Sequence, residues 1–324
     1  MSRKKICTIG GGTGNFVLLD GLKQYNVDLS AIVSMADDGG STGILRDELG
    51  VLPAGDTRQC LVALSHASRL MRDLMNDRFD TGILEGHSFG NLFLSALEKV
   101  TGSFEQAIEE VGKIRNMRGK VIPVTTEKVR LNMVLQDGTR LCGEKTIYLS
   151  EAIDQGYQSL FLTPQPQANR RAIDEIMNAD VVVLGPGGLF TSLIPNLLVD
   201  GVAEALRNTG ATKVFIVNLM NRKGQTTGYG VSDYLQQIVR YIGQDVFDVI
   251  LVNNKRPPSD LMERYKGEGE LVLNDLTDDR VIEIPLLGEL AQPTQNDNFA
   301  RNLIRHHRDI IAREICKIAD YTHV

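Results

Sequence analysis

A cluster of glycines near the N-terminus, between an apolar run and a helix-like segment, most constrains how this chain folds. The apolar run Ile6–Ile9 is followed by the glycine-rich turn 10–14 and by apolar side chains at helical spacing from Phe16 to Leu22. This order predicts a strand, a tight turn and a helix. Glycine lets a ligand approach the backbone closely, and the first N–H groups of a helix favour anions, so the turn is a candidate phosphate-binding loop. A tight connection that binds nothing is the alternative.

Two common phosphate-binding motifs do not match this turn. A P-loop would place a lysine directly after Gly14, where this chain has Asn15. The dinucleotide pattern G-x-G-x-x-G lacks its third glycine, because counting from Gly10 ends on Asn15 and counting from Gly12 ends on Val17. The turn therefore belongs to neither motif.

Apolar runs alternate with amphipathic stretches along the rest of the chain. Four further runs are rich in β-branched residues, as expected for strands that are buried on both faces. The alternation predicts an α/β fold, a Rossmann-like, doubly wound, mostly parallel sheet with helices on both faces. The expected strands are Leu29–Met35, Asp180–Gly185, Thr212–Leu219 and Phe247–Asn253, and the expected helices include Leu189–Leu206, Val231–Ile242 and Asn298–Ala319.

One segment has a different pattern. Asp137-Gly138 separates two strand-like runs, which is a strong hairpin signal. We therefore expect an antiparallel β insertion at about residues 120–165. Because the 324 residues contain no repeats or long linkers, we expect a single nucleotide-binding domain over residues 1–324 that carries this insertion.

The composition limits which classes of function are expected and in which cellular compartment the protein is expected. The net charge of −6 gives no basic field for nucleic acid. The four cysteines are far apart and lack metal-ligand spacing, which favours a reducing compartment over a zinc site or a disulfide framework. No apolar run approaches the ~18 residues of a membrane span. We expect a cytoplasmic protein with no membrane span.

Unusual polar residues follow the expected strands, at the positions where loops of a doubly wound sheet meet. Two glycine turns offer backbone N–H groups to phosphate oxygens, and arginines add charge-assisted bonds. These features predict a site for a phosphorylated, polar ligand, with two asparagines orienting it. The predicted binding residues are Gly11, Gly12, Thr13, Gly14, Asn15, Ser41, Thr42, Arg46, Asp56, Arg58, Asn91, Gly185, Gly187, Gly188, Thr191 and Asn218.

The acidic pair Asp37-Asp38 is unexpected beside a phosphate unless a divalent cation lies between them. Mg²⁺ takes one or two carboxylates and bridges to substrate phosphates, so these residues are the predicted metal ligands. A helix cap or an Asx-turn is the alternative for the aspartates. His87 has two interpretations: it is a catalytic acid-base group, or it only forms a hydrogen bond within its loop. His306-His307 is not expected to bind a metal, because adjacent helical residues face apart.

Several motifs occur in a fixed order along nearly the whole chain. They are Gly11-Gly12-Thr13-Gly14, residues 37–43 with Arg46, Gly55-Asp56-x-Arg58, His87-x-x-Gly90-Asn91-Leu92, Leu184-Gly185-Pro186-Gly187 and Asn218-Leu219-Met220 followed by Gly224. Together they resemble the 2-phospho-L-lactate transferase-like (CofD-like) family, and most closely its bacterial branch of gluconeogenesis factors.

The resemblance implies one of two functions. The archaeal-type transferase moves a phospholactate-like group from a guanylylated donor to a deazaflavin with Mg²⁺, which would make Asp37 and Asp38 catalytic. The bacterial branch implies a UDP-sugar-binding regulator of cell shape and wall growth on gluconeogenic carbon sources. Ser34-Met35-Ala36 replaces the Asn-Thr-Gly of the transferases, which favours the bacterial branch. Gln225-Thr226-Thr227 also departs from the family pattern, Gly-Glu-Thr.

The resemblance also implies ligands and partners. Tyr265 and Arg305 match the tyrosine and arginine that the bacterial branch associates with UDP-sugar binding. We expect a UDP-sugar such as UDP-N-acetylglucosamine, with GDP or NAD as alternatives, because no loop distinguishes uracil from guanine. No tightly bound cofactor other than Mg²⁺ is expected. A homodimer and cell-wall synthesis partners are the expected assemblies.

Overall fold

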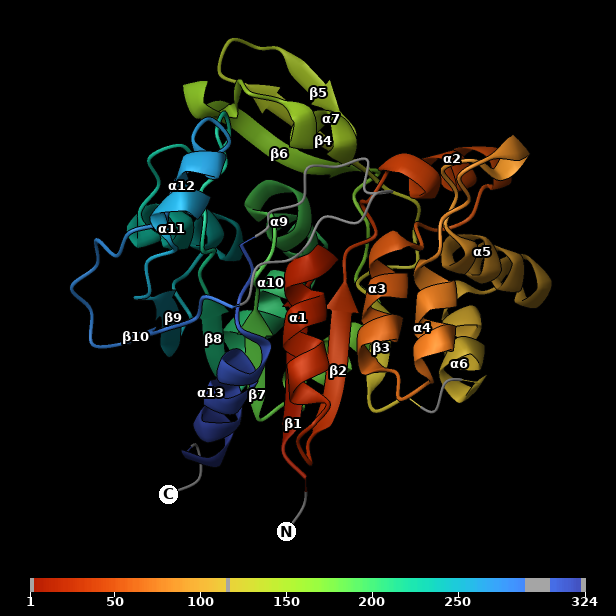
Figure 1. Cartoon of the computed structure of the whole chain (residues 1–324), viewed down its shortest axis with the longest axis horizontal. Helices are drawn as coiled ribbons and strands as arrows, with labels where there is room; N and C mark the ends of the chain where they lie inside the picture. Colours follow the sequence, from red (N-terminus) through yellow and green to blue (C-terminus); the bar gives the residue numbers. More distant parts are fainter. Residues whose placement is uncertain (1–2, 115–116, 289–303, 322–324) are drawn as a thin grey trace.

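Seven parallel strands form the main sheet of the computed structural model, which describes residues 3–114, 117–288 and 304–321 (Figure 1). The strand order is β10-β9-β8-β7-β1-β2-β3, so the chain starts in the middle of the sheet and builds outward in both directions. The strands are β1 Lys5–Gly10, β2 Asp28–Val33, β3 Lys120–Pro123, β7 Val181–Leu184, β8 Thr212–Ile216, β9 Val249–Asn253 and β10 Val281–Ile284.

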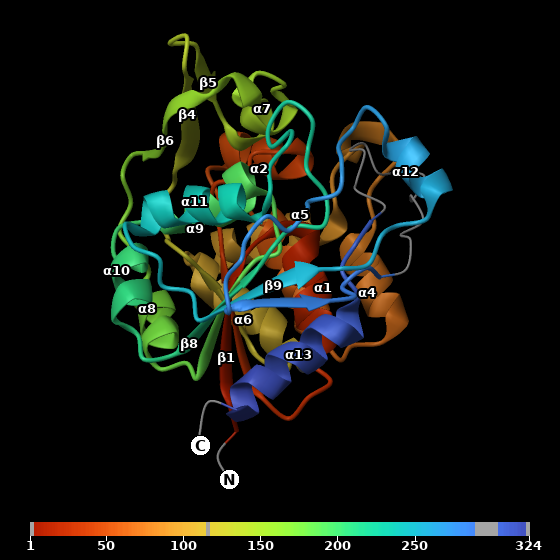
Figure 2. The same ribbon diagram turned by 90° about the vertical axis from the view of Figure 1, so that its left-hand side faces the viewer.

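The central strands are buried because helices cover both faces of the sheet. All four residues of β7 are buried, as are five of the six in β1. Helices α1, α3 and α13 cover one face, and α8, α10 and α11 cover the other (Figure 2). Their bounds are α1 Gly12–Leu22, α3 Gly55–Leu64, α8 Arg170–Met177, α10 Val202–Asn208, α11 Val231–Ile242 and α13 Arg308–Tyr321. The predicted doubly wound fold is confirmed.

The remaining described helices lie beyond the carboxyl edge of the sheet or beside its β3 end. None of the helices in the described part of the chain is long and apolar enough to cross a membrane. The remaining helices are α2 Gly40–Leu49, α4 Arg69–Asn76, α5 Phe89–Thr101, α6 Phe104–Ile114, α7 Glu144–Leu149, α9 Ile194–Leu197 and α12 Ser259–Tyr265, with short turns η1 Gly82–Leu84, η2 Ile153–Gln155 and a π-helical turn η3 Leu189–Leu193.

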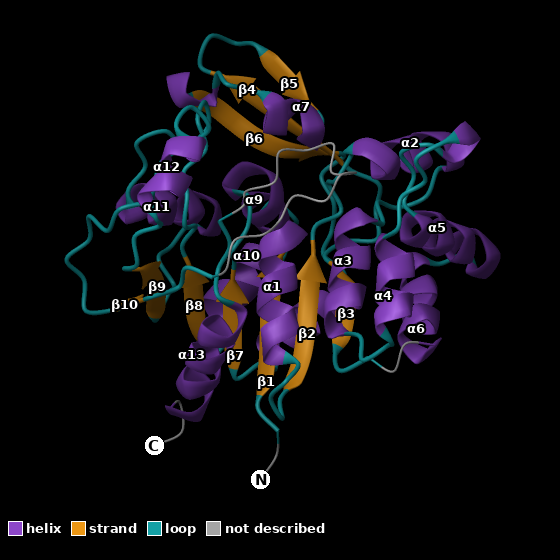
Figure 3. Cartoon of the chain, in the orientation of Figure 1, coloured by secondary structure: helices purple, strands orange, loops and turns teal. Residues whose placement is uncertain are grey.

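The antiparallel insertion lies above the carboxyl ends of the main strands (Figure 3). It is a three-stranded sheet in the order β5-β4-β6, formed by β4 Arg130–Leu135, β5 Arg140–Cys142 and β6 Tyr157–Thr163. Its hairpin turns at Gly138, which has a φ of +89°. The expected start near residue 120 differs from the structure, because Lys120–Pro123 pairs in parallel with β2 as an edge strand of the main sheet.

Two expected helices also differ from the structure. The stretch 189–206 forms η3, α9 and α10, because Pro195 lies in the first turn of α9, and Gly201, with a φ of +99°, separates α9 from α10 as the N-cap of α10. The C-terminal helix begins at Arg308 rather than Asn298. Residues 298–303 lie outside the described residues, and residues 304–307 are not helical.

Candidate functional site

The two glycine turns pack against each other at the carboxyl edge of the sheet. A Cβ atom on Gly14 would lie 2.3 Å from the carbonyl oxygen of Pro186. A Cβ atom on Gly187 would lie 3.6 Å from the carbonyl oxygen of Gly11. The loops after β1 and β7 therefore meet backbone against backbone, as expected for neighbouring parallel strands.

The N-terminus of α1 is left open by the side chains around it. Gly11 is its N-cap, and no side chain of the described residues caps it with a hydrogen bond. Gly12 needs a φ of +65°, which glycine adopts without strain. Asp56, in the first turn of α3, lies so close that a Cβ atom on Gly11 would be 2.2 Å from its Oδ2. The cradle thus combines backbone N–H groups with an adjacent carboxylate.

Asn15 supports this turn from inside. It is fully buried, and its amide nitrogen donates to the Sγ of Cys60 over 3.6 Å. Its Oδ1 has no hydrogen-bond partner within the described part of the chain. Burial raises the pKa of the Cys60 thiol, which therefore stays protonated.

The acidic pair lies at the entrance to α2. Asp37 accepts the N–H of Gly39 over 2.9 Å, which is an Asx-turn, and it also accepts a bond from the Thr42 hydroxyl. A Cβ atom on Gly55 would lie 2.3 Å from Asp37 Oδ2. Burial raises the pKa of Asp37, and the charge of Asp38 raises it further. Asp37 therefore forms the Asx-turn and also lies within the candidate site.

Asp38 joins the main domain to the insertion. It accepts the backbone N–H of Lys145 over 2.7 Å, and its Oδ2 lies 3.9 Å from Nη2 of Arg46. Gly143 packs so closely that a Cβ atom there would lie 2.4 Å from Asp38 Oδ2. The insertion therefore forms one wall of the site.

Glu144 is a site residue that the sequence analysis missed. It begins α7 and forms a side-chain hydrogen bond with Thr191 of the π-helical turn. Burial raises the pKa of Glu144 to about 9, and the charges of Asp37, Asp56 and Asp38 raise it as well. No sequence signal identifies it, because a lone glutamate in the insertion resembles any exposed helical residue.

A polar network orders the helices behind the acidic pair. Asn91 donates to the hydroxyl of Thr42 over 3.3 Å and accepts from Nε of Arg58 over 2.9 Å. Arg58 also donates to the backbone of Met75 and the side chain of Asn76, so its guanidinium ties α3 to α4 and α5. Its predicted contact with a ligand stays a prediction.

Other predicted residues lie around this network. The hydroxyl of Ser41 lies 3.1 Å from Nδ1 of His87, so the histidine contacts the site from its edge. Arg46 is only 7% exposed and contacts Asp38, and its Nη1 has no hydrogen-bond partner among the residues described. A buried guanidinium donor without an acceptor is unfavourable, and a ligand oxygen that reached it would supply the missing acceptor.

Tyr265 and Arg305 lie next to each other at the same edge. The hydroxyl of buried Tyr265 accepts the N–H of Ile304, the neighbour of Arg305. His306 reaches the carbonyl of Val217 over 3.1 Å, at the end of β8, and burial lowers the pKa of this histidine to about 4. Asn218, which follows Val217, has a buried Oδ1 without a partner in the described structure.

The loop with the departing motif has a structural role. The amide nitrogen of Gln225 donates to the carbonyl oxygens of Ile147 and Tyr148 over 3.0 Å and 2.7 Å, at the C-terminus of α7. Thr226 accepts from the hydroxyl of Tyr234 over 3.2 Å. Gln225 and Thr226 therefore hold the insertion and the loop itself in place.

The acidic side chains fit a cation only in partnership with a ligand. Among the residues described, no group of three or more His, Cys, Asp or Glu side chains is arranged to hold a metal ion. Mg²⁺ commonly takes one or two carboxylates and completes its shell with phosphate oxygens and water. Asp37 and Asp38, with their mutually unfavourable charges, fit that second arrangement.

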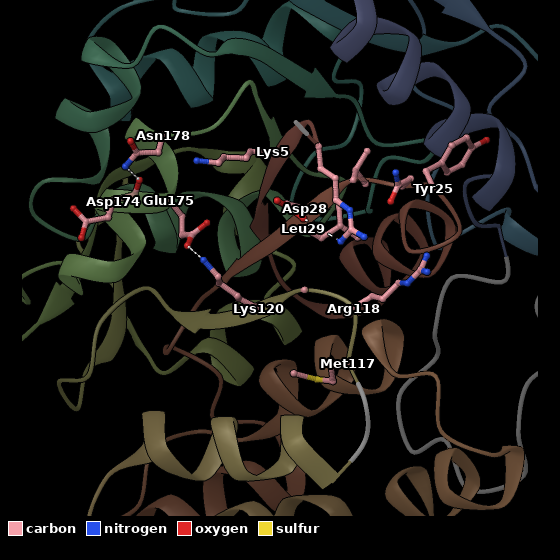
Figure 4. A pocket seen from close by; sticks show the side chains of 14 residues that line it. Lys5, Tyr25, Asp28, Leu29, Met117, Arg118, Lys120, Asp174, Glu175 and Asn178 are labelled. Atoms are coloured by element: carbon pink, nitrogen blue, oxygen red, sulfur yellow. Dashed lines mark hydrogen bonds and ion pairs between the residues drawn. The ribbon is translucent and has the colours of Figure 1, made fainter. Parts of the chain in front are cut away.

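A cavity lies away from this site, at the amino ends of β1, β2 and β3 (Figure 4). Its volume is about 510 Å³, and its wall includes Lys5, Asp28, Lys120 and Glu175. Lys120 is paired with Glu175 over 2.5 Å. None of the predicted binding residues lines it. Ligands of doubly wound sheets bind at the opposite edge, so we place the site at the glycine turns.

Comparison with known proteins gives consistent matches. The sequence profile of the family described as "2-phospho-L-lactate transferase CofD" matches residues 6–285. The gluconeogenesis factor of Halalkalibacterium halodurans is 39% identical over 318 residues, covering 97% of this chain and 96% of that protein. The gluconeogenesis factor of Bacillus subtilis is 39% identical over 312 residues, covering 96% of each. A crystal structure of a UPF0052 family member from Bacillus halodurans superposes with a TM-score of 0.87 at 38% identity, covering 98% of this chain and 99% of that one.

Proposed function

This chain belongs to the 2-phospho-L-lactate transferase CofD family, and on that premise we propose that it is a gluconeogenesis factor that binds a nucleotide diphosphate sugar. UDP-N-acetylglucosamine is the ligand of first choice. The observation that carries the proposal is the pair of glycine turns, Gly11–Gly14 and Gly185–Gly188, packed so closely that several positions leave no room for a Cβ atom. Such a backbone surface at a helix N-terminus suits the oxygens of a diphosphate.

The contacts of the acidic pair support binding rather than group transfer. Asp38 is engaged with the backbone of Lys145 and with Arg46, and Asp37 closes an Asx-turn. These bonds order the loops and the insertion around a ligand without requiring turnover. Ser34-Met35-Ala36, directly before the pair, also departs from the transferase pattern. We therefore propose a ligand-binding regulator with a transferase-derived site.

The names of relatives in the same family support the cellular role that we propose. Two of them are named gluconeogenesis factor. We propose that this protein acts in the cytoplasm on cell shape and wall growth during use of gluconeogenic carbon sources. A homodimer and proteins of cell-wall synthesis are the proposed partners, and sedimentation of the protein at micromolar concentration tests the dimer.

A second candidate is a Mg²⁺-dependent phospholactate or phosphoenolpyruvate transferase with a deazaflavin-like acceptor. The acidic pair Asp37-Asp38 favours it, because one or two carboxylates suit a cation bridged to a diphosphate. In that case Asp37 and Asp38 would hold Mg²⁺, which would neutralise the charge on the donor diphosphate.

Calorimetry tests the proposed function. Wild-type protein is titrated with UDP-N-acetylglucosamine, GDP and NAD, with and without Mg²⁺, and is assayed for group transfer. We expect the UDP-sugar to bind most tightly and no transfer to occur. The variant Asp38→Asn should lose the Mg²⁺-dependent part of binding. Preference for GDP, together with transfer that Asp38→Asn abolishes, would establish the transferase instead.

A further inference from the structure

Helix α7 of the insertion has its first residues in the nucleotide site. The residue before it, Gly143, packs against Asp38, and the N–H of Lys145 donates to the same carboxylate over 2.7 Å. The intervening side chain, Glu144, contacts Thr191 of the loop that follows β7. The N-terminal end of α7 therefore bridges the loops that follow β2 and β7.

The other end of α7 is held by the loop after β8. Gln225 donates to the carbonyls of Ile147 and Tyr148, and the guanidinium of Arg222 lies 3.5 Å from the ring centre of Tyr148. Gly224 packs so closely that a Cβ atom there would lie 2.3 Å from Cα of Glu151. The helix thus runs from the site to this loop with contacts at both ends.

Glu144 has a position that suits one part of a nucleotide sugar. It is half-buried, and the carboxylates of Asp37, Asp56 and Asp38 lie near enough for their charges to act on it. A carboxyl group that keeps its proton both donates to and accepts from hydroxyl groups and places no charge beside a phosphate, whereas the glycine turns offer N–H donors to phosphate. Arg46, which is 7% exposed and lies beside Asp38, adds a buried Nη1 donor that has no acceptor in the described structure. The unpaired donor of Arg46 on α2 and the carboxyl group of Glu144 on α7 thus both lie beside the acidic pair.

We propose that α7 is a clamp that places Glu144 against the hydroxyl-bearing part of the bound nucleotide sugar and so couples ligand occupancy to the position of the β5-β4-β6 insertion. The proposal rests on the proposed function and adds the regulation of the same site. A ligand shifts a conformational equilibrium only through contacts that differ between the two states. The contact with Glu144 supplies that difference, because it joins the ligand to the insertion rather than to the main sheet.

Binding measurements test the contact. Glu144→Ala is compared with Asp137→Asn, which removes a carboxylate from the hairpin tip of the same insertion. We expect Glu144→Ala to weaken UDP-N-acetylglucosamine binding by about tenfold, since it removes a hydrogen bond to a hydroxyl group of the ligand. Binding of inorganic pyrophosphate should stay the same or tighten, and Asp137→Asn should match the wild type. Unchanged affinity of Glu144→Ala for the UDP-sugar would overturn the contact.

Hydrogen exchange tests the coupling. In the wild type, UDP-N-acetylglucosamine should slow amide exchange in α7 and in β4–β6. In Gln225→Ala the sugar nucleotide should bind within about threefold of the wild type, because this side chain lies at the far end of α7. The ligand should slow amide exchange in β4–β6 less in Gln225→Ala than in the wild type. Arg222→Ala, which removes the contact with Tyr148, provides a second variant with the same expectation.

Different results would overturn the proposed function and the α7 clamp. Tight binding of the UDP-sugar without any change of exchange in α7 would overturn the clamp and leave the proposed function intact. Absence of binding by the wild type would overturn both. Equal slowing of exchange in the wild type, Gln225→Ala and Arg222→Ala would show that α7 does not transmit occupancy.

Discussion

The two walls of the site are built by different means. On the side of the main sheet, backbone packs on backbone, with Gly14 against Pro186 and Gly187 near Gly11. On the side of the insertion, the six-residue helix α7 is joined to the main domain mostly through side chains: Asp38 accepts the N–H of Lys145, and Gln225 donates to the carbonyls of Ile147 and Tyr148. Close packing has one arrangement, whereas a few hydrogen bonds can break and reform. The difference suggests a fixed phosphate cradle that faces a movable wall.

The largest expected effect concerns the fixed wall. In Gly14→Ala the new Cβ atom would lie 2.3 Å from the carbonyl oxygen of Pro186, so the two loops must separate. We expect a loss of about 3 kcal/mol in the free energy of unfolding, measured by urea denaturation, and loss of nucleotide binding. Gly210→Ala is the matched control, because a Cβ atom there meets nothing within 4 Å. Equal stability of the two variants would contradict the fixed cradle.

The next effect is a pH dependence of the movable wall. Burial and the neighbouring aspartates raise the pKa of Glu144 to about 9, from an ordinary value of 4.5. The folded state keeps this proton between those pH values and the unfolded state releases it, so the contribution to stability is full below pH 4.5 and is lost as the pH rises to 9. Glu144→Gln, which stays neutral, should be equally stable at pH 4.5 and more stable than the wild type at pH 8, because each pH unit above 4.5 costs the wild type up to about 1.4 kcal/mol.

Urea denaturation of the wild type and Glu144→Gln across this pH range checks the sign. If the free energies of unfolding of the two proteins change in parallel from pH 4.5 to pH 9, the surroundings of Glu144 do not raise its pKa. The contrast between a fixed wall at the glycine turns and a movable wall at the insertion would then have no support from Glu144.

The smallest effect concerns the anchor of α7. Gln225→Ala removes two hydrogen bonds to the C-terminal carbonyls of the helix, which should cost about 1 kcal/mol in the free energy of unfolding. Gln158→Ala is the control, because that amide contacts the carbonyl of Gln136 within the insertion and is exposed. A larger loss in Gln158→Ala than in Gln225→Ala would show that α7 is held by other contacts.

The fixed wall could be predicted from the sequence and the movable wall could not. Runs such as Asp180–Gly185 and the glycine turns after them are continuous in the sequence, so strand, loop and edge of the sheet follow from local patterns. The contact between Lys145 and Asp38 joins residues 107 positions apart. Glu144 enters the site only through the path of the insertion, and no local pattern encodes that path.

Other differences have local causes. Lys120–Pro123 is a short edge strand that ends in proline, so it lacks the long apolar run that marks the central strands. Gln225 departs from the family motif, yet the structure gives it a definite task at the end of α7. Asn218, Tyr265 and Arg305 lie at the carboxyl edge of the sheet, but their contacts with a ligand stay predictions.

A crystal structure of the complex with UDP-N-acetylglucosamine tests the central claim most directly. The account predicts that diphosphate oxygens lie about 3 Å from backbone nitrogen atoms of the turns 11–14 or 185–188, and that a hydroxyl group of the ligand lies within hydrogen-bond distance of Glu144. A ligand bound instead in the cavity beside Lys5 and Lys120, or one whose phosphates face the carboxylates while Glu144 stays free, would contradict it.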